Sequence, residues 1–367
     1  MKHTIKAIIL LIAISFLLVS CSSIPTADLA NPSPYAMFIT LDVPGKLTSP
    51  MYYVYGNTIK KIDDGLYGLL LNQEAFVYLR QTAQMDNPEL IYKNIKTDRT
   101  VKLITPDQFG TMIGMLISPG RKKLAIHVWP DGIATGNNLF IILDTDNILK
   151  NPTKLNISLI NKGKLYDSIK WIAAIGDDGS IVYVGSNGAP DEALVYRDAK
   201  GNEKIISKYK ENGDFDAVIS QGIHPPYKVA YIDSNTHTVY LLGKSGVWVF
   251  KSSTGSLSLT YPLKTVPSEG LWVDNSSQKL LVWGFKIGKA TIKIYNLDGS
   301  LVQTASGVRY SDPRIVDGKI FGIGAIKEKT IYSYTIGEIH LDTATPTINR
   351  IFISQDDIKW WDITAKR

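Results

Sequence analysis

An all-β fold is what this sequence predicts, from two observations made along the whole chain. Short runs rich in β-branched and aromatic residues, such as "KKLAIHVW" and "GSIVYVGS", recur between turn residues, and helical signals are nearly absent. Repeats of roughly 40 to 50 residues with four strands each are typical of β-propellers. We therefore expect a single β-propeller of seven four-stranded blades, with six or eight blades as the alternatives. The runs that follow a turn begin about 47 residues apart on average, at Met37, Ala75, Leu124, Ile181, Val229, Leu280 and Ile320.

The four strands of a blade can be read directly in two stretches of the chain. In the first, turn residues separate "IKWIAAIG", "SIVYVGS", "EALVYRD" and "EKIISKY", and they include Asp177-Asp178-Gly179. In the second, "GLWVDN", "KLLVWGF", "TIKIYNL" and "SLVQTAS" turn at Asn275-Ser276 and at Asp298-Gly299. Asp-Gly between alternating apolar runs is a strong hairpin signal. Each stretch therefore predicts one complete antiparallel blade.

The two ends of the chain supply complementary parts of one further blade. The C-terminal run "IKWWDIT", Ile358 to Thr364, has the pattern of an inner strand without a blade of its own. The N-terminal runs "AMFITLDV", "MYYVYGN" and "TIKKI" have the pattern of three strands that lack their inner one. A propeller must join its first and last blades to remove open sheet edges. We therefore expect the N- and C-terminal strands to close the ring by sharing a blade.

The first residues have the organisation of an export signal. Lys2 and Lys6 precede an unbroken run of thirteen apolar or small residues, "AIILLIAISFLLV". As a helix this run would span roughly 20 Å, well short of the ~30 Å hydrocarbon core of a bilayer. A leader that is cleaved is therefore favoured over a permanent transmembrane anchor. At its end stands Leu18-Val19-Ser20-Cys21, which contains the only cysteine of the chain.

This tetrapeptide resembles the lipobox of bacterial lipoproteins. The resemblance implies that Cys21 receives diacylglycerol and becomes the first residue after cleavage, so that the protein would meet the membrane through a lipid anchor. The alternative is a cysteine that merely ends an apolar leader or packs in a core. We expect a lipoprotein signal peptide over residues 1–20, a flexible tether rich in Ser, Pro and Asn over 21–35, and the propeller domain over 36–367.

The same resemblance places the protein in a bacterial cell envelope. In Gram-negative lipoproteins, a residue other than Asp after the acceptor usually means transfer to the outer membrane, and here that residue is Ser22. In a host with one membrane, the anchor would hold the protein at the outer face of the cell membrane. A second resemblance agrees with this location. The stretch "ISPGRKKLAIHVW", Ile117 to Trp129, resembles the "SPDGKKIAF" hairpin of TolB-type and WD-repeat-like propellers of bacterial envelopes, although Asp is missing before Gly120.

Charge and composition exclude one class of partner. The formal net charge is +6, and it becomes +4 once Lys2 and Lys6 leave with the leader. Basic residues are scattered among acidic ones without a block of like charge, which is not the pattern of a nucleic-acid-binding surface. No long Pro/Gly/Ser linker divides the chain after Tyr35. We expect a single-domain monomer that binds no nucleic acid.

No complete catalytic or metal-binding motif is present in the sequence. A G-x-S-x-G nucleophile elbow is missing, and the histidines after the leader, namely His127, His224, His237 and His340, are not paired at ligand spacing. The stretch "DTDN", Asp144 to Asn147, lacks the Gly and distal Glu of an EF-hand loop and is better explained as a turn. We therefore predict no catalytic residue, no metal site and no cofactor.

Three tryptophans are the candidate binding residues. Trp171, Trp272 and Trp360 all occur near the start of expected inner strands, which line the central channel of a propeller. Three large rings at equivalent places could stack on a sugar or a peptide. The alternative, which we weigh more heavily at this point, is that they fill the wedge between blades as core.

Two functions remain open from the sequence. The first is a lipid-anchored binding or scaffold protein that holds an envelope protein or a saccharide on its propeller. The second is a glycan hydrolase or lyase with acidic residues at the channel. Two carboxylates roughly 5 to 10 Å apart in a deep pocket would favour the enzyme, and a channel mouth without such a pair would favour binding.

Overall fold

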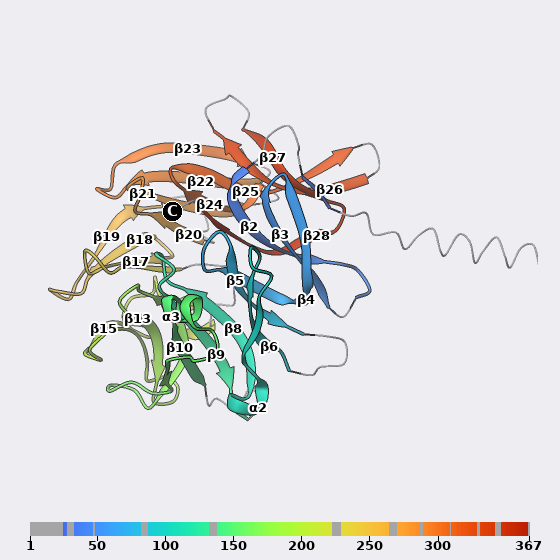
Figure 1. Cartoon of the computed structure of the whole chain (residues 1–367). Coiled ribbons are helices and arrows are strands. Elements are labelled where there is room, and N and C mark those ends of the chain that lie inside the picture. The colour runs from blue at the N-terminus through green and yellow to red at the C-terminus, as the bar shows by residue number, and fades with distance from the viewer. Residues whose placement is uncertain are drawn as a thin grey trace, which may run out of the picture.

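The computed structural model shows a ring of antiparallel sheets arranged around a common centre (Figure 1). The part of the chain that the structure describes is all-β apart from three short helices, α2 (Pro106–Phe109), α3 (Thr145–Lys150) and α4 (Asp216–Gln221). None of the helices in the described part of the chain is long and apolar enough to cross a membrane. The structure describes residues 25–27, 33–46, 48–81, 87–131, 138–221, 229–263, 270–286, 289–308, 310–328, 331–341 and 346–365.

The described strands form seven four-stranded blades, numbered from the one in which β28 pairs with β2. Blade 1 consists of β28 (Asp357–Thr364), β2 (Ser33–Asp42), β3 (Ser49–Gly56) and the first half of β4 (Thr58–Leu70). Blade 2 consists of the second half of β4 with β5 (Ala75–Arg80), β6 (Glu89–Asn94) and β7 (Thr100–Ile104). Blade 3 consists of β8 (Thr111–Ile117), β9 (Lys123–Trp129), β10 (Leu139–Asp144) and β11 (Ile157–Ile160).

The remaining four blades follow one another along the chain. Blade 4 is β12 (Ser168–Ile175), β13 (Ile181–Ser186), β14 (Glu192–Arg197) and β15 (Glu203–Lys208). Blade 5 is β16 (Ala230–Asp233), β17 (Thr238–Gly243), β18 (Gly246–Lys251) and β19 (Ser256–Pro262). Blade 6 is β20 (Gly270–Asp274), β21 (Lys279–Lys286), β22 (Lys289–Asn296) and β23 (Leu301–Val308). Blade 7 is β24 (Tyr310–Val316), β25 (Lys319–Glu328), β26 (Ile331–His340) and β27 (Thr347–Ser354), and the two-residue β1 (Thr26–Ala27) pairs with β27.

The predicted closure of the ring is confirmed. β28 pairs antiparallel with β2, from Ala36 opposite Thr364 to Asp42 opposite Asp357. Trp361 of β28 is fully buried and lies in one core cluster with residues of β2 and of blade 7. The last strand of the chain therefore completes the blade that the first strands begin.

Blades 1 and 2 share a single strand, which the sequence did not predict. The first half of β4 pairs with β3 and the second half pairs with β5, so both blades belong to one seven-stranded sheet. Gly65 lies at the crossing point and pairs with Ser49 on one side and Arg80 on the other. A Cβ atom at Gly65 would lie only 2.3 Å from the Leu79 carbonyl oxygen. Only glycine therefore fits where the strand passes between the blades.

The predicted blade starts agree with the structure at six of seven positions. Those six lie in the second strand of their blades, whereas Val229 directly precedes β16, the inner strand of blade 5. The second strand of that blade begins at Thr238. β16 has only four residues, and its apolar run looks like a second strand because nothing strand-like precedes it in the sequence. The register of the repeat was therefore wrong by one strand in blade 5.

Candidate functional site

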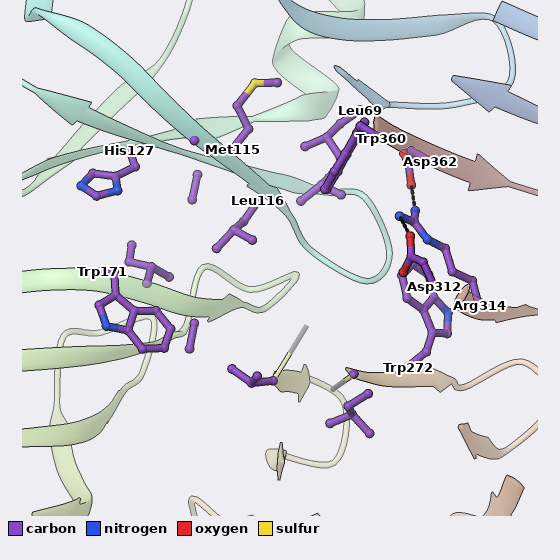
Figure 2. Close-up of a pocket in the computed structure, with 18 of the residues that line it drawn as sticks. Leu69, Met115, Leu116, His127, Trp171, Trp272, Asp312, Arg314, Trp360 and Asp362 are labelled. Carbon is purple, nitrogen blue, oxygen red and sulfur yellow. Dashed lines mark hydrogen bonds and ion pairs between the residues drawn. The ribbon is translucent and has the colours of Figure 1, made fainter. Parts of the chain in front are cut away.

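A central cavity lies where the seven blades meet, and every blade contributes residues to its wall. Its wall takes residues from the inner strands β4, β8, β12, β20, β24 and β28, and from Val229 beside β16. The cavity encloses about 1000 Å³, counted with the space at its opening to solvent. Inner strands converge on the axis of the ring, so residues far apart in sequence meet there. Figure 2 shows ten of the lining residues by name.

All three sequence-predicted tryptophans line this cavity. Trp171 of β12 is 7% exposed, while Trp272 of β20 and Trp360 of β28 are partly exposed. Trp171 lies on one side of the cavity, and Trp272 and Trp360 lie on the other (Figure 2). The structure thus brings the three rings to one hollow, although they come from blades 4, 6 and 1.

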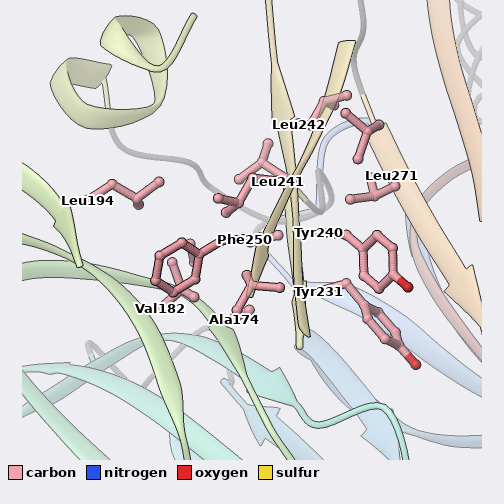
Figure 3. Packing of buried hydrophobic residues seen from close by; sticks show 14 of the residues in the cluster. Ala174, Val182, Leu194, Tyr231, Tyr240, Leu241, Leu242, Phe250 and Leu271 are labelled. Atoms are coloured by element: carbon pink, nitrogen blue, oxygen red, sulfur yellow. The ribbon is translucent and has the colours of Figure 1, made fainter. Parts of the chain in front are cut away.

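Each of the three tryptophans also packs on the core between blades. Trp171 belongs to the cluster that fills the wedge between blades 4, 5 and 6, together with Val182, Leu194, Tyr240 and Phe250. Figure 3 shows these four neighbours packed around β17 and β18. Trp272 and Trp360 pack from the outside on two other core clusters. The two interpretations left open by the sequence therefore overlap, because each ring has one side on the core and lines the cavity.

Arg314 of β24 lies among the aromatic rings on the Trp272 side. Its guanidinium carbon is 5.1 Å from the ring centre of Trp272, 5.6 Å from that of Trp360 and 4.4 Å from that of Trp361. The side chain is 4% exposed and forms ion pairs with Asp312 at 3.1 Å and with Asp362 at 3.3 Å. A cation desolvated against aromatic faces gains roughly 2 kcal/mol from each favourable contact. Trp272 and Trp360 are therefore partners of a buried cation that belongs to the protein itself.

Asp362 joins several blades to one another. Arg121, from the β8–β9 turn of blade 3, donates to both Asp362 oxygens at 2.7 and 3.1 Å. The backbone N–H of Leu70, at the end of β4, donates to Asp362 Oδ2 at 2.9 Å. Arg121 also donates to the Ile363 carbonyl at 2.6 Å. One carboxylate of the closing strand thus holds groups of blades 2, 3 and 7.

The charge of Asp362 is stabilised in spite of its burial. Burial by itself raises the pKa of this carboxyl, whereas Arg121, Arg314 and the Leu70 N–H lower it. The two cations prevail, and the pKa of Asp362 lies below its ordinary value. The side chain is therefore an ionised, fully paired carboxylate at neutral pH.

The two carboxylates on the cavity wall bear on the glycan-hydrolase alternative. Asp312 and Asp362 both line the cavity and both bind Arg314. A glycosidase needs one carboxyl with a raised pKa so that it can donate a proton to the leaving group. Asp362 has a lowered pKa, and Asp312 accepts a hydrogen bond from Trp361 Nε1 at 2.6 Å. This pair is arranged as the counter-charge of an arginine.

His127 of β9 lies on the cavity wall and has structural partners. Its Nε2 is 2.8 Å from Asn138 Oδ1, and its ring stacks on Phe140 with centres 4.5 Å apart. Asn138 in turn donates to the Lys170 carbonyl of blade 4. His127 thus helps to fix blade 3 against blade 4.

A second hollow of about 910 Å³ lies where the chain leaves the inner strands, and its lining includes Asp177, Asp274 and Asp317. Asp177 accepts the Gly120 N–H of blade 3 at 2.8 Å, and Asp274 accepts the Gly318 N–H of blade 7 at 2.9 Å. These carboxylates therefore hold the turns of neighbouring blades. In the part of the chain that the structure covers, no group of three or more His, Cys, Asp or Glu side chains is placed to hold a metal ion.

One sequence assignment is placed differently by the structure. Asp144 caps α3 by accepting the Asn147 N–H at 3.1 Å, so "DTDN" begins a short helix. The lipidation residue Cys21 lies outside the described residues. Sequence reasoning did not select Arg121, Asp312, Arg314 or Asp362, because Arg121 and Asp362, for example, lie 241 residues apart in the chain.

The fold is shared with several solved propellers at low sequence identity. The β-propeller domain of the Trilobed protease from Pyrococcus furiosus, described as having an open velcro topology, matches with a TM-score of 0.55 and 13% identity over 89% of this chain and 96% of that domain. The Pyrococcus horikoshii acylaminoacyl peptidase matches with the same TM-score and identity, but this chain covers only 52% of it. In this chain, by contrast with an open ring, β28 pairs with β2.

TolB from Acinetobacter baumannii also matches, at 12% identity over 74% of this chain and 66% of TolB, with a TM-score of 0.41. The chain thus spans about half of the peptidase and just under two thirds of TolB. None of the protein-family models compared with the sequence matches it, and no curated protein matches it either. The likenesses to the two Pyrococcus proteins show the β-propeller fold alone.

Proposed function

We propose that this protein is a lipid-anchored binding protein of a bacterial envelope, and that the central cavity is where it holds a protein or saccharide partner. The observation that carries the proposal is the meeting of Trp171, Trp272 and Trp360 in one hollow lined by all seven blades. A largely preformed apolar hollow with a few convergent polar groups is the usual form of a ligand site. Binding is supported over glycan hydrolysis because both wall carboxylates neutralise Arg314.

The anchor rests on the sequence around Cys21. The basic start, the apolar run and the single cysteine fall at the spacing of a lipoprotein signal. Metabolic labelling of the full chain with a fatty-acid analogue should mark the wild type and leave Cys21→Ser unlabelled. Label that persists in Cys21→Ser would rule out a lipid anchor at Cys21. The binding role of the cavity would then be tested separately.

Partner capture tests the cavity. The full chain with its anchor is used to capture binding partners from membranes, and the captured amount is compared with that of Trp171→Ala and Trp272→Ala. An aromatic anchor at an interface contributes roughly 2 kcal/mol or more, so capture should fall about thirtyfold in either variant. Trp129→Ala is the control, because Trp129 lies at the end of β9 and is not among the lining residues of the cavity.

The melting temperature of each variant is measured alongside capture. Capture that stays at the wild-type level in folded Trp171→Ala and Trp272→Ala would place the binding surface elsewhere. Capture that falls equally in Trp129→Ala would show a general effect of losing a tryptophan, and it would count against the cavity as well.

A further inference from the structure

We propose that the central cavity takes an uncharged ligand group with an apolar ring, and that it does not take a saccharide or an anion. This inference rests on the proposed function, since it names the ligand class of the same cavity. The proposed function names a protein or saccharide partner. The inference specifies the chemistry of the group that enters the cavity.

The wall of the cavity is mostly apolar. Of 21 lining residues, 15 are apolar, two are glycine, and only His127, Asp312, Arg314 and Asp362 carry polar groups other than an indole N–H. A saccharide would bring several hydroxyl groups into this hollow. Each buried hydroxyl without a partner costs roughly 1 to 3 kcal/mol. The wall is therefore complementary to an apolar ligand. Binding would remove apolar surface of both the wall and the ligand from water.

The charges on the wall are already compensated within the protein, although the buried Nε1–H of Trp171 and Nε–H of Arg314 have no hydrogen-bond partner among the described residues. His127 contacts Asn138, Asp312 accepts from Trp361, and Asp362 binds two arginines. Arg314 is compensated by two carboxylates and by three aromatic rings. An incoming anion would find no uncompensated cation, and an incoming cation would find no uncompensated carboxylate. A charged ligand would lose its hydration without gaining an uncompensated counter-charge.

The arrangement of the tryptophan rings also bears on the shape of the ligand. Trp171 lies on one side of the hollow and Trp360 on the other, with Met115 and Leu116 of β8 between them (Figure 2). A planar apolar ring can contact the tryptophan rings by offset or edge-to-face packing. The aliphatic side chains complete a dry surface around it. These features favour a ring over a linear alkyl chain.

The test uses a matched pair of fluorescent probes, N-phenyl-1-naphthylamine and 8-anilino-1-naphthalenesulfonate. They share one aromatic skeleton and differ by a single sulfonate. The full chain is studied in a nonionic detergent, and energy transfer from tryptophan to the probe separates bound probe from probe dissolved in micelles. The expected result is saturable binding of the neutral probe, with the sulfonated probe roughly tenfold or more weaker. The disaccharide cellobiose should not displace the neutral probe.

Two variants test whether the probe lies in this cavity. Ala173→Met adds bulk to a lining residue of β12, and Trp171→Phe shortens one ring without breaking a hydrogen bond, since Trp171 Nε1 has no partner among the described residues. Both should weaken the neutral probe roughly tenfold or more while the protein remains folded. Leu301→Ser is the control, since Leu301 is 55% exposed on the outer strand β23. If Ala173→Met fails to fold, Trp171→Phe still decides the question.

The outcomes separate this inference from the proposed function. If cellobiose or the sulfonated probe binds as tightly as the neutral probe, and Ala173→Met abolishes that binding, the ligand class is wrong while the cavity remains the binding site. If the neutral probe does not saturate, or if both variants bind it like the wild type, the inference is overturned. If captured partners are also held normally by Ala173→Met, the proposed function fails too. Release of a captured protein by the neutral probe would show that the ring belongs to that protein.

Discussion

The two sides of the central cavity hold tryptophans in different ways. On the apolar wall, defined by Met115, Leu116, Trp171 and Ile172, Trp171 packs among hydrocarbon side chains and its Nε1 has no partner in the described residues. On the charged wall, defined by Trp272, Asp312, Arg314, Trp360 and Asp362, the rings stack on a paired arginine. Trp360 Nε1 also donates to the Gly68 carbonyl at 2.9 Å. Trp272 and Trp360 thus contribute to ring closure on the charged wall, whereas Trp171 packs among apolar side chains on the other wall.

Removing β28 is the change with the largest expected effect, because it takes Trp360 and Asp362 from the charged wall and leaves the apolar wall intact. Deleting residues 357–367 removes Trp361, Ile363 and Asp362, each 2% exposed or less, and opens the edge of β2. Losing buried side chains of this size costs several kcal/mol each, against a total stability of roughly 5 to 15 kcal/mol. We expect no cooperative unfolding transition in differential scanning calorimetry. Deletion of residues 366–367 alone is the control and should melt like the wild type; a normal transition in the longer deletion would contradict the closure.

Replacing Asp362 by Asn tests the charged wall with its backbone in place. The substitution leaves Arg121 and Arg314 without their shared carboxylate in a buried setting. Breaking a buried ion pair from one side typically costs roughly 3 to 5 kcal/mol. The free energy of unfolding, measured by urea denaturation, should fall by about that amount. Asp357→Asn, on the same strand but exposed, should change it by less than about 0.5 kcal/mol.

The difference in unfolding free energy between the wild type and Asp362→Asn should depend on pH. The folded-state pKa of Asp362 is lowered, so the carboxylate contributes stability that is present above its unfolded pKa of about 3.9 and is lost as pH falls through the folded value. The gap in unfolding free energy between wild type and Asp362→Asn should therefore be constant from pH 7 to about 5 and narrow below about pH 4. A gap that widens in acid would mean that the pKa of Asp362 is raised in the folded protein.

Two tryptophan substitutions, one on each wall, should differ by a smaller amount in their effect on the free energy of unfolding. Trp360→Phe removes the hydrogen bond to Gly68 and weakens the stacking on Arg314, which should cost roughly 1 to 3 kcal/mol. Trp171→Phe removes no hydrogen bond and should cost less than Trp360→Phe, because only apolar contacts are lost. Thermal melting of both variants measures the difference. Equal losses in the two variants would remove the distinction between the walls.

Much of the architecture could be read from local patterns. The hairpins of blades 4 and 6 follow from turn residues such as Asp177-Asp178-Gly179, and the shared blade at the termini follows from an unpaired inner strand. Such signals are local because strand propensity and turn geometry depend on a few neighbouring residues. The double use of β4 was missed because Gly65 is required by the approach of the Leu79 backbone, and that approach exists only in the folded ring.

The cavity was predicted in part. Three aromatic rings near the starts of inner strands indicated a common axis, and the structure places them around one hollow. The charged wall could not be predicted, because Asp362, Arg121 and Arg314 are ordinary charged residues in the sequence, and only the ring brings them together. Arg121 has a φ of 59° in a hairpin turn, which is a conformation that no composition pattern reveals. Long-range electrostatic pairing of this kind has no local signature.

The pairing of β28 with β2 sets an order of events during biosynthesis. β2 is among the earliest strands to be made and β28 is made after every other described strand, so blade 1 lacks its inner strand until residues 357–364 have been synthesised. Until then β2 presents an unpaired backbone edge, and unpaired edges are where chains associate wrongly. Ribosome-bound chains of this protein should therefore depend on factors that shield β-strand edges, and that dependence should end when β28 emerges.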